Sequence, residues 1–215
     1  MKKTLVLALV SVFAMVGSVR GDLIISGVVD GDLSGGNPKA IILTATAAIP
    51  NLSVFGVGSA NNGGGTDGEE FSLSGSAAAG DIIIVAGNAD SEAFFADCFG
   101  HSVLTDGAAN INGDDAVELF MNGNVIDTFG DINVDGTGQV WEYSDGYAVR
   151  NSGVAGPFVA ADWGFFDDAL DGLSEADQKS TIGEAFGLSA AVIPEPSSLA
   201  LLGLASLGMI VRRRR

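Results

Sequence analysis

Residues 116–129, with the sequence AVELFMNGNVIDTF, decide the fold class of this chain. Two β-prone runs, residues 116–121 and 124–129, flank the dipeptide Asn122-Gly123. Asn-Gly between two such runs is the strongest short-range signal for a two-residue β-hairpin, because both turn positions need a positive φ. We therefore expect an antiparallel hairpin here and a fold built mainly from strands.

Other short β-prone runs continue this pattern along the chain. We expect strands over residues 23–29 (closed by a turn at Asp30-Gly31-Asp32), 39–46, 52–57, 71–74 and 82–86, and a second hairpin over 139–143 and 147–151. Residues 91–99 predict one or two helical turns with Asp90 or Ser91 as N-cap, and residues 174–186 predict a short helix or a linker. Many short strands with few helices indicate an all-β fold, namely a β-sandwich with one short helix. A partly open barrel is the alternative architecture.

Both ends of the chain have the composition of targeting segments. Lys2 and Lys3 precede an apolar stretch, which indicates a secretory signal peptide over residues 1–21, with cleavage after Ser18 as the alternative. At the other end, an apolar run over residues 199–211 follows a Pro-Glu-Pro triplet and precedes four arginines. This run is shorter than the roughly 20 residues that span a bilayer comfortably, and the arginines would stay on the cytoplasmic side.

This three-part tail, residues 194–215, resembles the PEP-CTERM sorting signal of Gram-negative bacteria. The residues that carry the resemblance are Pro194, Glu195, Pro196, Arg212, Arg213, Arg214 and Arg215. In that family an exosortase-type membrane protease removes the tail, and the protein moves to the outer surface or the extracellular matrix. The resemblance implies that the tail holds the chain at the inner membrane only transiently; an ordinary anchor that is never cleaved is the alternative.

Charge excludes some classes of partner for the segment between the two targeting signals. Only Lys39, Arg150 and Lys179 remain as bases in residues 22–193, against 26 acids, so the formal charge of this segment is −23. Nucleic acids and anionic membrane surfaces are bound through Lys and Arg, so neither is an expected partner. Cations and neutral polymers suit such a segment better. The single cysteine rules out an internal disulfide.

Eight short motifs follow one another in a recognisable order between residues 22 and 163. They are DLIISG (22–27), LSG (73–75) with AGD (79–81), NGDDAVEL (112–119), VIDTFG (125–130), WEYSDG (141–146), VRN (149–151) and DW (162–163). This order resembles the lamin-tail-type domain in its bacterial secreted form, over residues 22–175. The resemblance implies an immunoglobulin-like β-sandwich with an adhesive or structural accessory role, followed by a linker over residues 176–193.

Residues 131–142, DINVDGTGQVWE, match the spacing of a calcium-binding EF-hand loop. The candidate ligands are the side chains of Asp131, Asn133 and Asp135, the carbonyl of Thr137 and a bidentate Glu142. An EF-hand also needs a helix on each side, and the flanks of this loop are typical of strands. Calcium is thus the one cofactor that the sequence raises, with a solvated acidic turn as the alternative. For Asn112-Gly113-Asp114-Asp115 we expect a metal-free turn whose aspartates cap backbone amides.

No set of residues in the sequence matches a known catalytic arrangement with specificity. Cys98 and His101 are the single cysteine and histidine, and two ligands do not make a zinc site, so we expect a buried or half-buried Cys98. Trp141, Tyr143 and Trp163 are expected in the core, with Tyr147 the aromatic residue most open to solvent.

These observations together predict a non-enzymatic, exported protein of the cell surface or extracellular matrix. Its expected partners are the exosortase-type protease during sorting, and then an extracellular polysaccharide or a surface protein. A small secreted hydrolase that uses carboxylate chemistry is the alternative.

Overall fold

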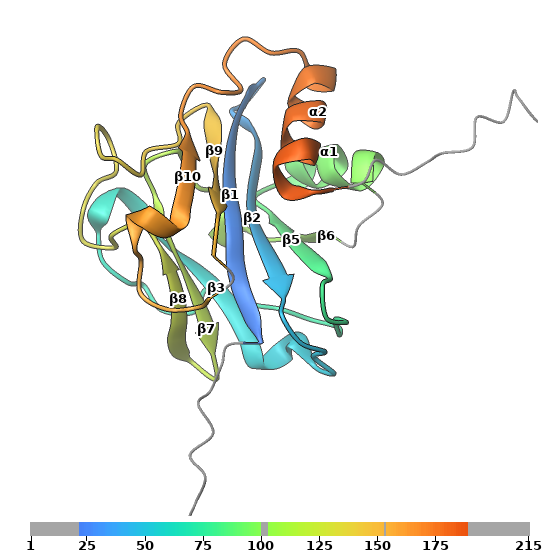
Figure 1. Cartoon of the computed structure of the whole chain (residues 1–215), viewed down its shortest axis with the longest axis vertical. Helices are drawn as coiled ribbons and strands as arrows, with labels where there is room; N and C mark the ends of the chain where they lie inside the picture. The colour runs from blue at the N-terminus through green and yellow to red at the C-terminus, as the bar shows by residue number, and fades with distance from the viewer. Residues whose placement is uncertain (1–21, 100–102, 153, 189–215) are drawn as a thin grey trace, which may run out of the picture.

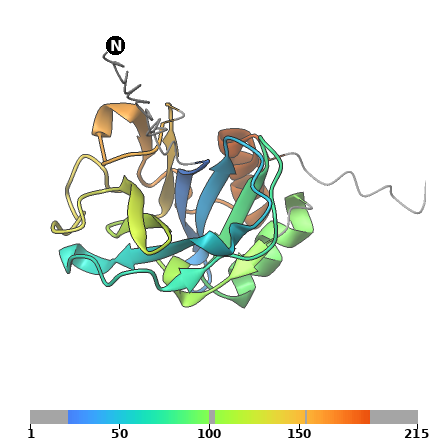
Figure 2. The same cartoon turned by 90° about the horizontal axis from the view of Figure 1, so that it is seen from below.

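Two sheets form the body of the protein in the computed structural model, which describes residues 22–99, 103–152 and 154–188 (Figure 1). The first sheet has six strands in the order β10-β9-β1-β2-β5-β6, and the second has four in the order β4-β3-β7-β8. Figure 2 shows the sheets as two layers. The predicted β-sandwich is therefore confirmed.

The bounds of the elements follow the chain order. The six-stranded sheet contains β1 (Leu23–Leu33), β2 (Asn37–Ala45), β5 (Ile82–Ala86), β6 (Val103–Thr105), β9 (Gly146–Arg150) and β10 (Trp163–Phe166). The four-stranded sheet contains β3 (Phe55–Ala60), β4 (Phe71–Ser72), β7 (Ala116–Met121) and β8 (Asn124–Phe129). The helices are α1 (Ala89–Phe99) and α2 (Glu175–Phe186), and short 3-10 turns occupy Leu52–Val54, Asn61–Gly63, Gly107–Ala109 and Ala160–Asp162.

The hairpin predicted from Asn122-Gly123 forms as expected. Strands β7 and β8 are antiparallel neighbours, and Met121 pairs with Asn124 across the turn. Asn122 and Gly123 have φ values of 51° and 73°, the left-handed conformation that a two-residue hairpin turn demands.

Two local predictions are wrong, namely the turn that was expected to close the first strand and the second hairpin. Asp30-Gly31-Asp32 does not close the first strand, because β1 runs on to Leu33 and Asp30 pairs with Lys39 of β2 inside the ladder. The second hairpin does not form either, because residues 139–143 are a series of turns, and β9 pairs with β1 and β10 instead. At the second place a strand far away in the sequence, β1, replaces the neighbouring run as a partner of β9.

Two apolar cores lie on opposite faces of the six-stranded sheet. The inner core fills the space between the sheets with side chains such as Leu23, Ile41, Leu119 and Phe129. The outer core packs a different set, including Ile42 and Ile84, against the helices. Strands β2 and β5 therefore need apolar residues on both faces, which explains the nearly continuous apolar run of β5.

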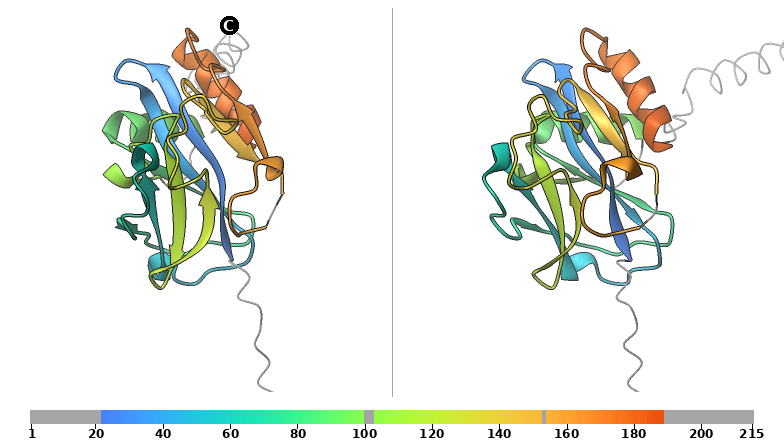
Figure 3. Two further views of the ribbon diagram at one scale, coloured as in Figure 1. Left: turned by 90° about the vertical axis from the view of Figure 1, so that its left-hand side faces the viewer. Right: turned by 60° about the vertical axis from the view of Figure 1, so that its left-hand side comes forward.

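Both helices cover the outer face of the six-stranded sheet, and α2 lies on the side away from β7 and β8 (Figure 3). Helix α1 begins at Ala89, so Asp90 and Ser91 lie inside it rather than at its N-cap. Its first turn is capped instead by Asn88, whose Oδ1 accepts a hydrogen bond from the Ser91 N–H at 2.9 Å.

Helix α2 is the second helix of the domain, and it occupies the segment 174–186 for which the sequence predicted either a short helix or a linker. Ser174 is its N-cap, and Gly187 ends it in the left-handed conformation with φ of 63°. Ile182 of this helix is fully buried. The first part of the segment predicted as a linker, 176–193, is thus a packed part of the domain, because its apolar side chains cover a sheet face that would otherwise be exposed. No helix of the described residues is long and apolar enough to cross a membrane.

Candidate functional site

The predicted calcium loop, residues 131–142, connects β8 to the turns before β9. Its carboxylates are engaged separately, each by a backbone amide within four residues. Asp131 Oδ1 accepts from the Asn133 N–H at 3.0 Å, Asp135 Oδ1 from Thr137 at 2.9 Å, and Glu142 Oε2 from Gly138 at 2.6 Å. The Thr137 N–H lowers the pKa of Asp135 by favouring its charged form.

These carboxylates do not converge on one point. In the described part of the chain, one set of three metal-ligating side chains has its ligand atoms within 4.8 Å of one another, and it contains neither Asp131, Asp135 nor Glu142. Calcium binding by the 131–142 loop would therefore require the loop to rearrange, and it stays a prediction.

The structure does bring the two predicted acidic segments together. Asp114 accepts a backbone hydrogen bond from Gly136 through its carbonyl, and its Oδ2 accepts one from Thr137 Oγ1 at 3.1 Å. Gly136 packs so closely against Trp141 that a Cβ there would lie 2.6 Å from the indole ring. Close packing and these hydrogen bonds hold the loop against the turn at residues 112–115.

The turn at residues 112–115 forms as predicted, through its own aspartate. Asp115 accepts hydrogen bonds from the backbone N–H groups of Asn112 at 2.7 Å and Asn62 at 2.9 Å. Burial of this side chain raises its pKa, while the two N–H groups oppose the shift. Its role is to cap amides, which is a structural one.

A second carboxylate cluster joins three segments that are distant in sequence. Asp32 of β1, Asp145 before β9 and Asp171 before α2 place carboxylate oxygens within 4.8 Å of one another. Partial burial raises the pKa of Asp145, and the charges of Asp32 and Asp171 raise it further. Three carboxylates offer the hard oxygen ligands that Ca²⁺ and Mg²⁺ prefer. Exposed acidic groups also gather in proteins without an ion, so proximity alone assigns no metal here.

Nothing local in the sequence pointed to this cluster, because more than one hundred residues separate Asp32 from Asp145. In the sequence, the polar residues Asp30 and Asn37 lie close to Asp32. Those two residues point elsewhere: Asp30 pairs with Lys39, and Asn37 Oδ1 accepts from Ser91 Oγ at 3.0 Å.

Lys39 is buried and makes the three hydrogen bonds that an ammonium group can donate. Its Nζ contacts the Asp30 carboxylate, the Ile111 carbonyl at 2.8 Å and Asn112 Oδ1 at 2.9 Å. The second Asp30 oxygen accepts from the Gly113 N–H at 2.9 Å. Burial raises the pKa of Asp30, and Lys39 opposes the shift. This ion pair ties β1 and β2 to the turn before β7.

Arg150 forms the second buried ion pair, with Asp127 at 2.7 Å, and the two side chains are only 4% and 0% exposed. Arg150 Nε also donates to the Ile25 carbonyl at 2.6 Å, and its guanidinium lies 4.5 Å from the ring centre of Trp163. Asp127 in turn accepts from the Ile25 N–H at 2.8 Å. Since Asp127 belongs to the four-stranded sheet and Ile25 to the six-stranded one, the network joins the two sheets.

The aromatic residues are core residues, as predicted for Trp141, Tyr143 and Trp163. All three pack edge-on around the Phe129 ring, with centroid distances of 4.7–6.1 Å. Tyr147 has the largest exposed fraction of the four aromatic residues, as expected, but at 7% it is buried as well. Its ring stacks on the Phe166 ring with a centroid distance of 4.7 Å, and Phe186 of α2 packs against it. The sequence alone did not show whether this segment was a helix or a linker.

Several predicted residues lie outside the described part of the structure. These are the signal peptide, His101, the side chain of Cys98 and the whole of the 194–215 sorting signal, including its apolar run. The structure therefore tests only those predictions that concern the domain between the targeting segments.

Comparison with known proteins identifies the C-terminal segment. A family model of the PEP-CTERM protein-sorting motif matches residues 192–215. No curated protein matches the chain, and no solved structure does. The likeness of residues 22–175 to lamin-tail-type domains has no family match behind it and stays a prediction. The motif indicates an exported protein with a C-terminal membrane-anchoring sorting signal that an exosortase membrane enzyme processes.

Proposed function

We propose that this chain is a non-enzymatic β-sandwich protein that acts as a structural or adhesive component of the outer surface or the extracellular matrix. The observation that carries the proposal is the sorting motif at residues 192–215, joined directly to a folded domain. Release of the tail by an exosortase-type enzyme would leave this domain as the mature protein outside the inner membrane.

The distribution of charge supports neutral rather than anionic partners. Two of the three bases in residues 22–193, Lys39 and Arg150, are buried in ion pairs, and the third, Lys179, pairs with Glu175. The outer surface of the domain therefore carries acids with almost no bases among them. Such a surface repels nucleic acids and acidic polymers, whereas a neutral polysaccharide or a surface protein meets no such repulsion.

The surroundings of three buried acids with raised pKa values support a structural rather than a catalytic role for these three. A catalytic acid needs a raised pKa together with access to a substrate. Asp30 and Asp127 have raised pKa values, but they are buried and bonded to Lys39, Arg150 and backbone amides. The pKa of Asp115 is also raised, and its carboxylate caps two backbone amides. These contacts fit acids that hold the sandwich together.

Localisation tests the sorting part of the proposal. The full chain would be expressed in an exosortase-bearing Gram-negative host and in the same host lacking the enzyme, beside a variant with Arg212–Arg215 replaced by Gln. We expect a shortened protein outside the cell only in the first case, seen by intact mass and by cell fractionation. Full-length protein in the inner membrane of the exosortase-bearing host would contradict the proposal.

We also propose that calcium stabilises the domain, and a thermal melt with millimolar calcium and then with chelator tests this. A ligand that binds only the folded chain raises the melting midpoint by mass action. If the 131–142 loop binds the ion, Asp131→Ala should abolish the shift. Asp171→Asn, which removes one carboxylate of the other cluster, is the matched comparison. An unchanged midpoint in the unsubstituted protein would remove calcium from the proposal.

A further inference from the structure

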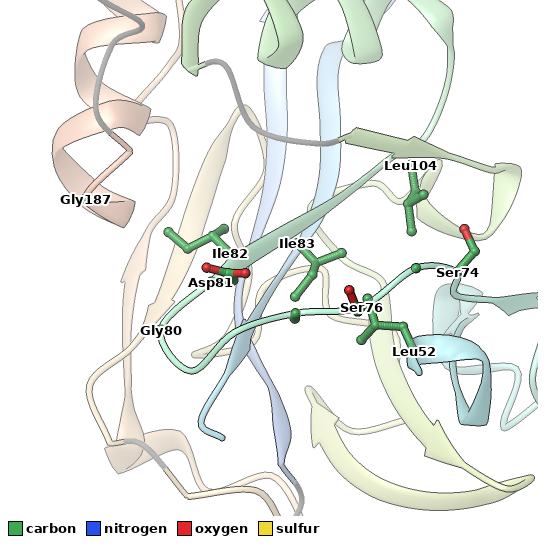
Figure 4. Close-up of a pocket in the computed structure, with 11 residues that line it drawn as sticks. Leu52, Ser74, Ser76, Gly80, Asp81, Ile82, Ile83, Leu104 and Gly187 are labelled. Carbon is green, nitrogen blue, oxygen red and sulfur yellow. The ribbon is translucent and has the colours of Figure 1, made fainter. Parts of the chain in front are cut away.

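A groove opens beside the point where the described chain ends. It has a cavity volume of about 470 Å³ and lies between Gly187, at the end of α2, and Leu104 of β6. In Figure 4, Gly187 lies on one side, Leu104 and Ser74 lie on the other, and Asp81 to Ile83 lie between them. The groove therefore begins next to Leu188, the last described residue.

The walls of the groove combine apolar and polar surface in nearly equal parts and carry a single charged side chain. Leu52, Ile82, Ile83 and Leu104 supply apolar surface. Asp81 is the single charged residue among those that line it, and its carboxylate is engaged by the Ala78 N–H at 2.7 Å. The groove thus suits an uncharged segment of small polar and apolar residues, and it offers no cation to an anionic ligand.

The chain itself supplies such a segment immediately after the groove. Residues 189–193 are Ser-Ala-Ala-Val-Ile, which are uncharged and mostly small or apolar, and Pro194 of the sorting signal follows them. Five residues in extended form span up to about 17 Å, so the segment can extend into the groove from the edge at Gly187. Because the segment is tethered at the mouth of the groove, its effective concentration there is high.

We propose that residues 189–193 bind in this groove and form an intramolecular contact between the domain and its sorting signal. The contact would hold Pro194 against the domain, so that the tail leaves from a fixed place rather than from a free tether. The contact itself does not depend on the proposed function, but its importance for sorting rests on that function.

Disulfide trapping in the full chain tests the contact directly. Ser76→Cys, in the groove, would be combined with a single cysteine placed in turn at residues 190–193, and the protein exported to the oxidising periplasm of a host without exosortase. A disulfide needs Cα atoms within roughly 7 Å, so pairing reports close contact. We expect intramolecular disulfides at one or two of the four positions, seen by mobility without reductant and by mass spectrometry of the linked peptides.

Glu184→Cys provides the matched control, because Glu184 is exposed on the last turn of α2 and is also near the start of the tail. A docked segment should pair several-fold faster in the Ser76→Cys chains than in the Glu184→Cys chains. Equal or faster pairing at position 184, or no pairing at position 76, would overturn the proposal, as would disulfide-linked dimers in place of the intramolecular bond. Chains with one introduced cysteine reveal any pairing with Cys98.

A charge placed in the groove gives a second test. Ile82→Asp, on the half-buried wall, should lower the preference for position 76 several-fold, whereas Val125→Asp, on the exposed β8 edge, should leave it unchanged. If the Ile82→Asp variant kept the same preference for disulfide formation at position 76, that result would contradict docking of the segment in the groove. Tail processing is scored separately in the exosortase-bearing host. An intact tail there contradicts the sorting proposal and leaves the disulfide result standing.

Discussion

Asp127 shows at the scale of one residue how the two sheets are held together. Its carboxylate lies on β8, yet it accepts hydrogen bonds from Ile25 of β1, at 2.8 Å, and from Gly156, at 3.0 Å, besides its ion pair with Arg150. These donors and the Arg150 charge favour the charged form of the carboxylate and oppose the rise in its pKa that burial causes. The network therefore sets how the sheets are placed relative to each other as well as contributing to stability.

We predict that Asp127→Asn destabilises the domain by about 3–5 kcal/mol, because it leaves the Arg150 charge buried without a partner. Urea unfolding, followed by the fluorescence of the buried Trp141 and Trp163, would measure the change. Glu175→Gln is the control, since it breaks an exposed ion pair with Lys179 and should cost less than about 1 kcal/mol. Equal losses in the two variants would show that the buried pair has no special role.

The β7–β8 turn illustrates the scale of the single element. Gly123 has φ of 73°, and a Cβ at this position would meet no atom within 4 Å. Substitution there is thus opposed by backbone conformation alone, without any steric clash. The hairpin carries Asp127 and Phe129, so its register decides whether the network between the sheets can form.

We expect Gly123→Ala to destabilise the domain by about 1–2 kcal/mol, the cost of the left-handed conformation for a residue with a Cβ. Gly107 offers a control, because it also has open space around a built Cβ but lacks a positive φ. Gly107→Ala should change the free energy of unfolding by less than about 0.5 kcal/mol. A neutral Gly123→Ala would mean that the turn can adopt another conformation without loss.

Helix α2 is the element whose role the sequence indicates least clearly. It lies over β1 and β9, and Phe186 packs so closely on Gly27 that a Cβ on Gly27 would clash with the Phe186 ring. Gly27 therefore has no side chain because the helix lies directly on the strand.

The stability of Ile182→Ala tests whether α2 belongs to the domain. We predict a loss of about 2–5 kcal/mol, since Ile182 is fully buried in the outer core and its removal leaves a cavity. Glu184→Ala, exposed on the same helix, should lie within about 0.5 kcal/mol of the unsubstituted protein. Thermal unfolding by circular dichroism would measure both. A neutral Ile182→Ala would instead favour a detachable linker.

At the scale of the whole molecule, acidity governs how stability responds to pH. Burial raises the pKa of Asp115, Asp145 and Asp167, three acids that form no ion pair among the described residues, so the folded chain takes up protons at a higher pH than the unfolded chain does. Folding is therefore coupled to proton uptake between the unfolded pKa, about 3.9, and the raised values. Asp135, whose pKa is lowered, opposes this trend.

We predict that the melting midpoint rises as the pH falls from 7.5 towards 5, and that the gain ends near pH 4, where the unfolded carboxyl groups are protonated as well. Differential scanning calorimetry across this range would measure it. Repeating the series in high salt separates the two causes, because salt screens repulsion among surface acids but acts little on buried ones. A midpoint that falls steadily below pH 7 would contradict the prediction.

The features that could be predicted are those decided by adjacent residues. Asn122-Gly123 predicted its hairpin because only a few residue types tolerate a positive φ at both turn positions. Asp115 predicted its turn because the amide that it caps is three residues away. The apolar run of β5 indicated a strand buried on both faces. Each of these depends on a short stretch of chain.

The sequence by itself determined the strand-rich class, the hairpin and the sorting signal, since turn conformation, alternation and a contiguous motif are all encoded locally. Only the tertiary structure decided that β9 pairs with β1, that α2 covers Tyr147, and that Asp32 meets Asp145. The reason is that a strand can pair with any edge of suitable register. The choice among edges follows from burying both faces of the six-stranded sheet at once, a condition that involves residues across the whole domain.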